Sequence, residues 1–347
     1  LIYKINIALL SIAFVFILCF YYRNSLRCCF KKAVFPIIGK LIKPGYLLSL
    51  IKKNRFFSLL IMIIMLQLSV NLIGVLGPET SFDALWYHLT LPKLYIVGHS
   101  IFHIPGNLLF YSDMPKLTEM LYIPMLMFSN ELGAKFMHFT FGILTLIVIY
   151  KISNKYLSRN LSLLAVLIFY SNLVVGWESI TSYIDLARTF FEVLALWGFL
   201  KWTENKQKKW IIISGTMLGL AISSKVIALE SVLIFILLFM YLYVVYKEKI
   251  QDLIKNISIF CFFSLLIPLP WFIFAFINTG NPFYPFFSKS IDIGTGFSLP
   301  IISNILNDFL NLFIYSNDPI SPIYLAVLPL LIIFYRKAKQ EFKIIYI

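Results

Sequence analysis

The sequence predicts an all-α polytopic membrane protein with about nine transmembrane helices. Hydrophobic residues make up 60% of the 347 positions, whereas charged residues make up only 13%. A soluble domain carries roughly 25% charged residues, and the mean hydropathy of this chain is +0.86. Because so few charges cannot cover a fold of this length in water, the excess apolar surface must face lipid.

The apolar runs of the chain approach the length that a bilayer requires. A hydrocarbon core of about 30 Å needs roughly 20 apolar residues in a helix. Some of the runs are shorter, and we expect their helices to extend beyond them or to tilt. The predicted spans are 5–22, 56–76, 136–150, 161–177, 184–202, 210–223, 226–246, 257–277 and 320–335.

Charged residues divide between alternate loops of this arrangement. Most of the 30 basic residues fall in the loops after the first, third, fifth, seventh and ninth spans, and most of the 16 acidic residues fall on the other side. Cytoplasmic loops carry such a basic excess. We therefore place the basic loops in the cytoplasm. The same distribution explains the net charge of +14, so we expect no nucleic-acid partner.

The predicted organisation has three parts. Residues 1–55 form an extra N-terminal span and a basic cytoplasmic loop, 56–335 form the transmembrane core, and 336–347 form a basic cytoplasmic end. The chain starts at Leu1 rather than Met and stops just after a basic segment, so we expect a truncated C-terminal end. Two long outer loops, 77–135 and 278–319, are where we expect the functional residues.

The first outer loop contains two apolar-rich stretches. Four apolar residues between 82 and 89 have the i, i+3, i+4, i+7 spacing of one helix face, and we expect Pro92 to interrupt this helix. The second stretch covers 116–128. We expect both to form short helices in the plane of the membrane interface.

Asp83 lies in the first turn of the first predicted helix. The helix dipole stabilises a carboxylate at such a position. One interpretation is a general base that takes a proton from an acceptor hydroxyl or amine. The other is an acid that only marks the start of the helix.

All four histidines lie in or beside the first outer loop. The i, i+4 spacing of His99 and His103 would suit a metal on a helix. The Pro105-Gly106 pair that follows argues against a helix there. We therefore expect no metal and no other cofactor, and the sequence does not indicate a divalent ion.

The predicted fifth span opens with three charged residues, Asp185, Arg188 and Glu192. Their spacing places them on one helix face. Ionisable groups within a membrane are costly and usually face a cavity or a partner. These three form either a local ladder of ion pairs or an active-site wall near the outer leaflet.

Lys225 falls in a tight outer turn, apart from the basic inner loops. A cation there either binds the phosphate of a lipid carrier or extends to the outer headgroups. Glu230, in the next span, would pair with Lys225 or with another helix.

The aromatic-rich segment 268–287 contains two further features. Pro268 and Pro270 should kink its helix, and the Gly-Asn-Pro run at 280–282 should end it. The segment either lines an apolar groove for an isoprenoid chain or forms an aromatic belt at the interface.

Several runs together resemble the GT-C superfamily of integral-membrane glycosyltransferases. The resemblance is closest to bacterial members of the dolichyl-phosphate-mannose protein mannosyltransferase and aminoarabinose transferase type, and it covers about residues 56–335. It implies a GT-C-like bundle with interfacial helices in the first outer loop. The runs are FDALWYHLTLPKLYIVG (82–98), DMPKLTEML (113–121), SYIDLARTFF (182–191), GLAISSK (219–225) and PWFIFAFINTGNPFYPF (270–286).

The resemblance implies transfer of a sugar from a polyprenyl-phosphate donor to an acceptor, with inversion, on the extracytoplasmic face of the plasma membrane. Asp83 matches the general base and Asp185 a second acid that lines the site. Lys225 and Arg188 match the cation that neutralises the donor phosphate. The other expected substrate contacts are Tyr87, His88, Asp113, Lys116 and Asn281.

Two departures from the family pattern concern the acceptor, which we expect to be a lipid, a glycan or a protein of the cell envelope. Many relatives have Asp-Glu at the first acidic site, where this chain has Asp83-Ala84. Protein mannosyltransferases have His-Pro-Pro where this chain has Asp113-Met114-Pro115, which weighs against a protein acceptor.

Two other classes of function compete with this one. A transporter or lipid flippase is the first, although transporters often show internal repeats and none is evident here. An inactive relative that serves as a scaffold is the second.

Overall fold

The computed structural model describes residues 54–287 except 107 and 248, together with six isolated positions (307, 311, 324, 325, 329 and 333). The described residues contain helices and no strand, which agrees with the predicted all-α class. The predicted span 5–22, the C-terminal end 336–347, and most of span 320–335 and of the second outer loop lie outside them.

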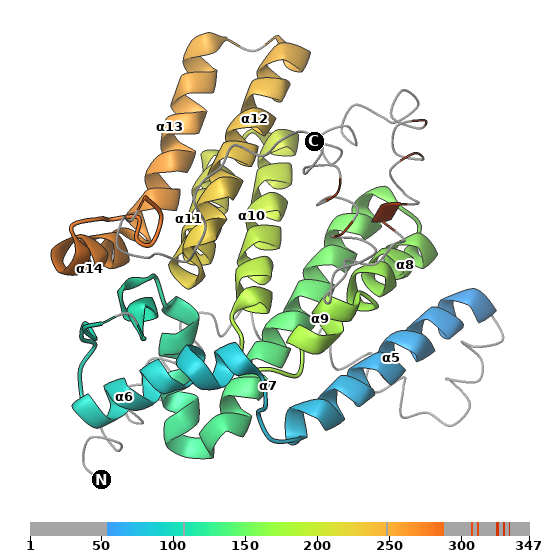
Figure 1. The fold of residues 1–347 in the computed structure, drawn as a ribbon. Coiled ribbons are helices and arrows are strands. Elements are labelled where there is room, and N and C mark those ends of the chain that lie inside the picture. The colour runs from blue at the N-terminus through green and yellow to red at the C-terminus, as the bar shows by residue number, and fades with distance from the viewer. Residues whose placement is uncertain are drawn as a thin grey trace, which may run out of the picture. The chain divides into compact units, whose positions relative to one another are not determined.

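The chain divides into two units, Leu1–Leu66 and Gln67–Ile347. The described part of the first unit is the beginning of α5 (Arg55–Leu76), an apolar helix that continues into the second unit. The other elements belong to the second unit (Figure 1). They are η2 (Ala84–His88), α6 (Thr90–Gly98), η3 (Phe110–Asp113), α7 (Leu117–Tyr156), α8 (Arg159–Tyr170), α9 (Leu173–Glu178), α10 (Asp185–Asn205), α11 (Lys208–Ser224), η4 (Val226–Ala228), α12 (Leu229–Tyr246), α13 (Ile250–Leu266) and α14 (Leu269–Thr279).

Three helices in the described part of the chain are long and apolar enough to cross a membrane: Arg55–Leu76, Leu117–Tyr156 and Val226–Tyr246. The pair α13 and α14 qualifies together but is bent by 58°. The protein is therefore a helical membrane protein. The predicted count of about nine spans is not confirmed, because the described residues supply fewer helices of sufficient length.

Two predicted spans are not continuous helices. The run 161–177 is divided between α8 and α9, and Asn172 between them caps α9 by accepting a hydrogen bond from Val174 N–H. The run 257–277 is divided between α13 and α14 at Pro268. This second break confirms the predicted proline kink, and α14 ends at Gly280 in the left-handed conformation, as the Gly-Asn-Pro run predicts.

The first outer loop differs from the prediction in its helix boundaries. The first helical turn ends at Leu89 rather than at Pro92. Pro92 lies in the first turn of α6, where its missing N–H leaves no helical bond unmade. The predicted stretch 116–128 begins α7, which has non-helical dihedral angles at Ser129 and Asn130. Residues 131–135, predicted as loop, are helical.

Small residues allow close packing of the helices that carry the site. A Cβ on Gly198 of α10 would lie 3.1 Å from the Ser214 backbone of α11, and a Cβ on Gly215 would lie 2.6 Å from Phe260 O of α13. Close backbone approach is typical of membrane helix pairs. The hydrophobic effect contributes little between helices in lipid, so their association depends on van der Waals packing. This packing brings α10 alongside α11 and α11 alongside α13 (Figure 1).

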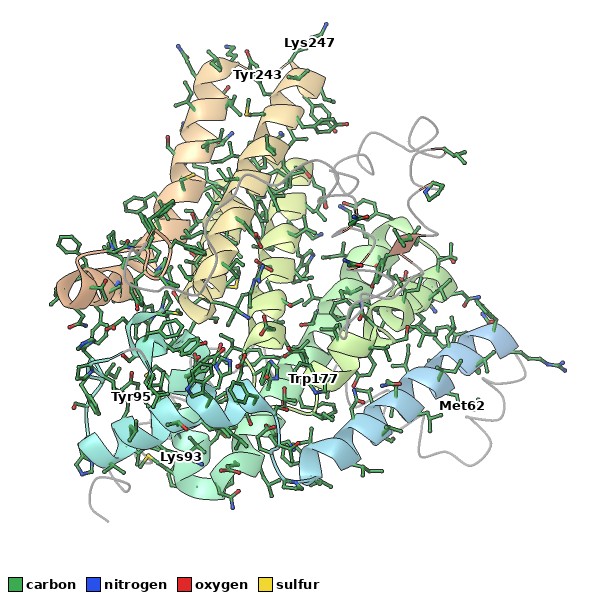
Figure 2. All side chains as sticks on the ribbon, viewed as in Figure 1. Met62, Lys93, Tyr95, Trp177, Tyr243 and Lys247 are labelled. Atoms are coloured by element: carbon green, nitrogen blue, oxygen red, sulfur yellow. The ribbon has the colours of Figure 1, made fainter. Side chains whose placement is uncertain are left out.

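The basic loops among the described residues lie at one end of these helices. The Lys206 ammonium is 4.4 Å from the Trp202 ring and 5.7 Å from the Tyr246 ring, so the α10–α11 and α12–α13 connections are neighbours. Asp185 and Lys225 lie at the opposite helix ends. Figure 2 likewise shows Lys247 far from the outer-loop residue Lys93.

The beginning of the first outer loop is fixed by the buried Lys135 of α7. Its ammonium donates hydrogen bonds to the carbonyls of Gly74, Gly77 and Pro78, at 2.8 to 3.2 Å. The Gly74 carbonyl lies in the last turn of α5 and the other two follow it, where helical partners are missing. Lys135 therefore caps α5 and sets the direction in which the chain enters the loop.

The two ends of the bundle should be labelled from opposite sides of a membrane. In a background whose native cysteines are replaced by serine, we expect Lys93→Cys and Lys247→Cys to react with an impermeant maleimide from opposite faces of sealed vesicles. Detergent permeabilisation, which exposes both positions, is the control. Labelling of both from one face of the intact vesicle contradicts the arrangement.

Candidate active site

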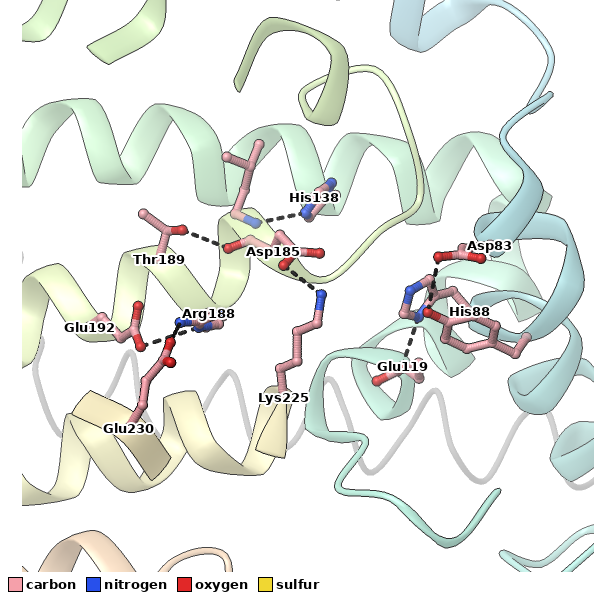
Figure 3. A network of polar contacts seen from close by, with 12 residues as sticks. Asp83, His88, Glu119, His138, Asp185, Arg188, Thr189, Glu192, Lys225 and Glu230 are labelled. Atoms are coloured by element: carbon pink, nitrogen blue, oxygen red, sulfur yellow. Dashed lines mark hydrogen bonds and ion pairs between the residues drawn. The ribbon is translucent and has the colours of Figure 1, made fainter. Parts of the chain in front are cut away.

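An ion pair joins the predicted residues Asp185 and Lys225. The Lys225 ammonium lies 2.7 Å from Asp185 Oδ1, which connects the first residue of α10 with the residue that ends α11. Glu230, the other partner considered for Lys225, binds Arg188 Nη2 instead, at 3.0 Å. Lys225 is therefore held where α10 begins and α11 ends (Figure 3).

The buried His138 of α7 contacts the backbone on both sides of Asp185. His138 Nδ1 lies 2.9 Å from Thr181 O and Nε2 lies 3.0 Å from Leu186 N. A carbonyl only accepts and a backbone N–H only donates, so Nδ1 carries the proton and Nε2 accepts. A neutral imidazole thus joins the Thr181 carbonyl to the Leu186 N–H and fixes the backbone on both sides of Asp185.

Asp83 lies at the start of η2 and is half-buried. The Tyr87 hydroxyl donates to Asp83 Oδ2 at 3.3 Å, and the Asp83 N–H donates to the Tyr183 hydroxyl at 3.3 Å. Burial, with the negative charge of Asp83, raises the pKa of Tyr87, and burial raises the pKa of Tyr183 to about 12. Both phenols therefore remain protonated near neutral pH and act on Asp83 as hydrogen-bonding groups.

Glu79 links the segment before Asp83 to the segment before Asp185. Its Oε1 accepts from the N–H groups of Thr80 and Ser81, both at 3.0 Å, and its Oε2 accepts from Ser182 N–H at 2.7 Å. Glu79 is only 8% exposed. One buried carboxylate thus holds two loop segments, about 100 positions apart in sequence, beside each other.

A second buried pair faces the same region. His88 Nδ1 lies 2.9 Å from Glu119 Oε1, with side-chain exposures of 1% and 5%. The neighbouring Tyr87 ring stacks on Tyr111, with ring centroids 3.6 Å apart and planes 2° from parallel. Figure 3 shows Asp83, His88 and Glu119 on one side of the site, with Asp185 and Lys225 on the other.

These elements surround a cavity of about 150 Å³. Tyr87, Tyr111 and Glu119 line it from the first outer loop and α7, and Lys225 lines it from the end of α11. The cavity therefore presents a carboxylate, an ammonium and phenols within largely apolar walls, which is typical of a site for a small polar group.

Five predicted substrate-binding residues (His88, Asp113, Lys116, Arg188 and Asn281) are not among the residues that line this cavity, and neither are the two predicted catalytic acids, Asp83 and Asp185. Asp113 is buried and pairs with His103 Nδ1 at 2.9 Å. Arg188 is engaged by Glu192 at 3.2 Å and by Glu230, as the ion-pair interpretation predicts. Asn281 bonds the backbone of its own turn at Phe283 and Phe286. Their contacts with a substrate stay predictions.

Lys116, another of these residues, is 1% exposed, and its ammonium makes no hydrogen bond. It lies 4.8 Å from the Trp271 ring and 4.9 Å from the Phe274 ring. Such contacts stabilise a cation by attraction to the ring faces. The lysine therefore connects the first outer loop to α14.

Sequence reasoning missed Glu79, Glu119, Tyr111 and Tyr183 as parts of the site. Glu119 lies in an apolar helix, 31 positions from His88, and no local spacing relates the two. Glu79 lies near the start of the first outer loop, where an acid is common. A buried partner is what distinguishes these acids, and the sequence does not show it.

Metal ligation receives no support from the part of the chain that the structure describes. No group of three His, Cys, Asp or Glu side chains there is placed to hold an ion. His99 follows α6 in a left-handed conformation with φ of 54°, so His99 and His103 do not share a helix face.

Residues 120–274 match a family model described as dolichyl-phosphate-mannose-protein mannosyltransferase. The matched segment includes Asp185, Arg188 and Lys225, whereas Asp83 and Glu119 precede it. No curated protein and no solved structure matches the chain. The match confirms the predicted resemblance, over a shorter range than 56–335, and it supports a general glycosyltransferase role.

The burial of Lys116 should make stability depend on pH. Burial lowers the pKa of Lys116 from 10.5 to about 8, so between these values the unfolded chain binds more protons than the folded one, and stability rises with pH. We expect the melting temperature of the wild type in detergent to rise relative to that of Lys116→Met over this interval. The exposed Lys93→Met is the matched control. A difference in melting temperature between the wild type and Lys116→Met that does not change with pH contradicts the burial of Lys116.

Proposed function

We propose that this protein is a GT-C glycosyltransferase that moves a sugar from a polyprenyl-phosphate-linked donor to an acceptor hydroxyl or amine, with inversion at the anomeric carbon. One observation carries the proposal beyond the family resemblance. Tyr87, which hydrogen-bonds Asp83, and Lys225, which pairs with Asp185, line the same small cavity. A base and a phosphate-neutralising cation close to one small cavity are what this reaction requires.

In the proposed reaction Asp83 takes the proton of the acceptor group. The acceptor oxygen or nitrogen then forms a bond to the anomeric carbon, while the bond from that carbon to the phosphate oxygen breaks. The electron pair of the broken bond leaves with the polyprenyl phosphate. The hydrogen bond from Tyr87 at 3.3 Å orients the carboxylate of Asp83 without protonating it, because the pKa of the phenol is raised.

Lys225 supplies the positive charge that the leaving phosphate needs. Lys225 lines the cavity, and its ammonium is already held by Asp185 at 2.7 Å. A cation fixed in advance stabilises developing charge without reorganising during the reaction. Asp185 therefore acts by positioning Lys225, and we assign the ion-pair ladder of Arg188, Glu192 and Glu230 to support of α10 and α12.

The isoprenoid chain of the donor would lie along the end of α14. Pro285 and Phe286 line the cavity, and Phe276, Ile277 and Phe287 nearby in sequence are exposed. Exposed apolar side chains beside a polar cavity suit a substrate that has a charged head and a hydrocarbon tail. We place this region at the extracytoplasmic face of the plasma membrane, since the basic loops lie at the other end.

The bend between α13 and α14 is a feature that transporters also have. Transporter sites lie near the bilayer midplane at such breaks. The ionisable groups of the described site gather instead at one end of the helices, which favours chemistry at a membrane surface. Flux assays test this alternative directly.

Removal of the proposed base should greatly reduce turnover. We expect Asp83→Asn to lower the release of polyprenyl phosphate from glucosyl and mannosyl polyprenyl phosphates by about 10²- to 10⁴-fold, the usual contribution of a general base. Purified protein would be assayed with lipid, glycan and peptide acceptors.

Asp252→Asn, at an exposed acid in the first turn of α13, is the matched control and should keep full turnover. If Asp83→Asn turns over at the rate of the wild type, Asp83 is not the general base. Donor movement across vesicles without any turnover would identify a transporter or flippase instead.

A further inference from the structure

The proposed reaction leaves one buried acid without a role. Glu119 is 4% exposed, and its Oε2 has no hydrogen-bond partner. A buried carboxylate oxygen without a partner costs free energy, because it has given up its hydration. Glu119 also lines the cavity, so a ligand bound there is a candidate partner for this carboxylate.

The other oxygen of Glu119 is fixed. His88 Nδ1 lies 2.9 Å from Oε1, and the His88 ring is held by the Tyr87 ring, with centroids 4.1 Å apart. With Glu119 ionised, Nδ1–H donates to Oε1. The carboxylate therefore cannot turn freely, and the unpartnered Oε2 keeps a defined position.

Neighbouring cations do not use this oxygen. The Lys116 ammonium, three positions earlier, makes no hydrogen bond and faces Trp271 and Phe274. The Lys225 ammonium, across the cavity, is bound to Asp185. Glu119 thus retains an open acceptor in a site whose cations are already engaged.

The shape and chemistry of the cavity suit a sugar ring. Glu119 shares the cavity wall with the stacked rings of Tyr87 and Tyr111. A carboxylate accepts hydrogen bonds from the hydroxyls of a sugar, and phenol groups also exchange hydrogen bonds with them. The volume of about 150 Å³ limits the occupant to a single small ring.

We propose that Glu119 binds a hydroxyl group of the donor's sugar ring and that His88 positions it to do so. This inference rests on the proposed function and deepens it, because it names the residue that recognises the glycosyl group rather than the phosphate. Glu119 is thus a binding and specificity residue, distinct from the base and from the phosphate contact.

Equilibrium binding separates sugar recognition from phosphate recognition. The ligands are polyprenyl phosphate and its glucosyl, mannosyl and galactosyl derivatives, measured against purified protein in detergent. We expect the wild type to bind at least one glycosylated ligand more tightly than polyprenyl phosphate. In Glu119→Gln, the affinity for that ligand should fall about tenfold or more, as expected for a lost charge-assisted hydrogen bond, and the affinity for polyprenyl phosphate should not change.

Two further variants keep the test decisive. His88→Phe keeps a ring but removes the nitrogen that fixes Glu119, so it should reduce the preference for the glycosylated ligand even if Glu119→Gln fails to fold. Glu131→Gln changes a partly exposed acid of the same helix, paired with Lys93, and should behave as the wild type.

The outcomes distinguish the inference from the function on which it rests. If Glu119→Gln or His88→Phe binds polyprenyl phosphate normally and keeps the full sugar preference, or if the wild type has no such preference, the inference is overturned while the proposed function stands. If the wild type binds none of the four lipids, the proposed function itself fails.

Discussion

The buried carboxylate of Glu79 is the constraint on which the candidate site depends. It accepts backbone hydrogen bonds from Thr80, Ser81 and Ser182, and so joins the first outer loop to the chain that enters α10. Together with the hydrogen bond from the Asp83 N–H to the Tyr183 hydroxyl, this link keeps the segments of Asp83 and Asp185 close to each other. Lys135 supports it by capping α5 through three carbonyls, so that the loop begins at a fixed point.

Two cations near the site are paired with carboxylates before any substrate arrives. Lys225 is paired with Asp185, and Arg188 with Glu192 and Glu230. Isolated charges beside a low-dielectric region are strongly disfavoured, and pairing offsets much of that penalty. A phosphate that reaches Lys225 therefore meets a cation already in place, while Glu119 leaves one acceptor oxygen open.

The sequence contains enough information for the fold class and for part of the site. Apolar run length indicates the helices, and the proline residues of 268–287 indicate the α13–α14 break. The acids Asp83 and Asp185 and the cation Lys225 stand out because charges are rare in this chain. Glu119 and Glu79 do not, since their importance arises from partners 31 and 103 positions away. The continuity of 161–177 is misread because Asn172 caps a new helix rather than lying within one.

Binding of polyprenyl phosphate to Lys225→Met tests most directly the central claim, that this cavity is where a lipid-linked phosphate is held. Lys209→Met, at an exposed lysine of the opposite helix end, is the matched control. The account predicts that Lys225→Met weakens binding about tenfold or more and that Lys209→Met leaves it unchanged. Equal affinities of the wild type and both variants for polyprenyl phosphate would contradict the claim.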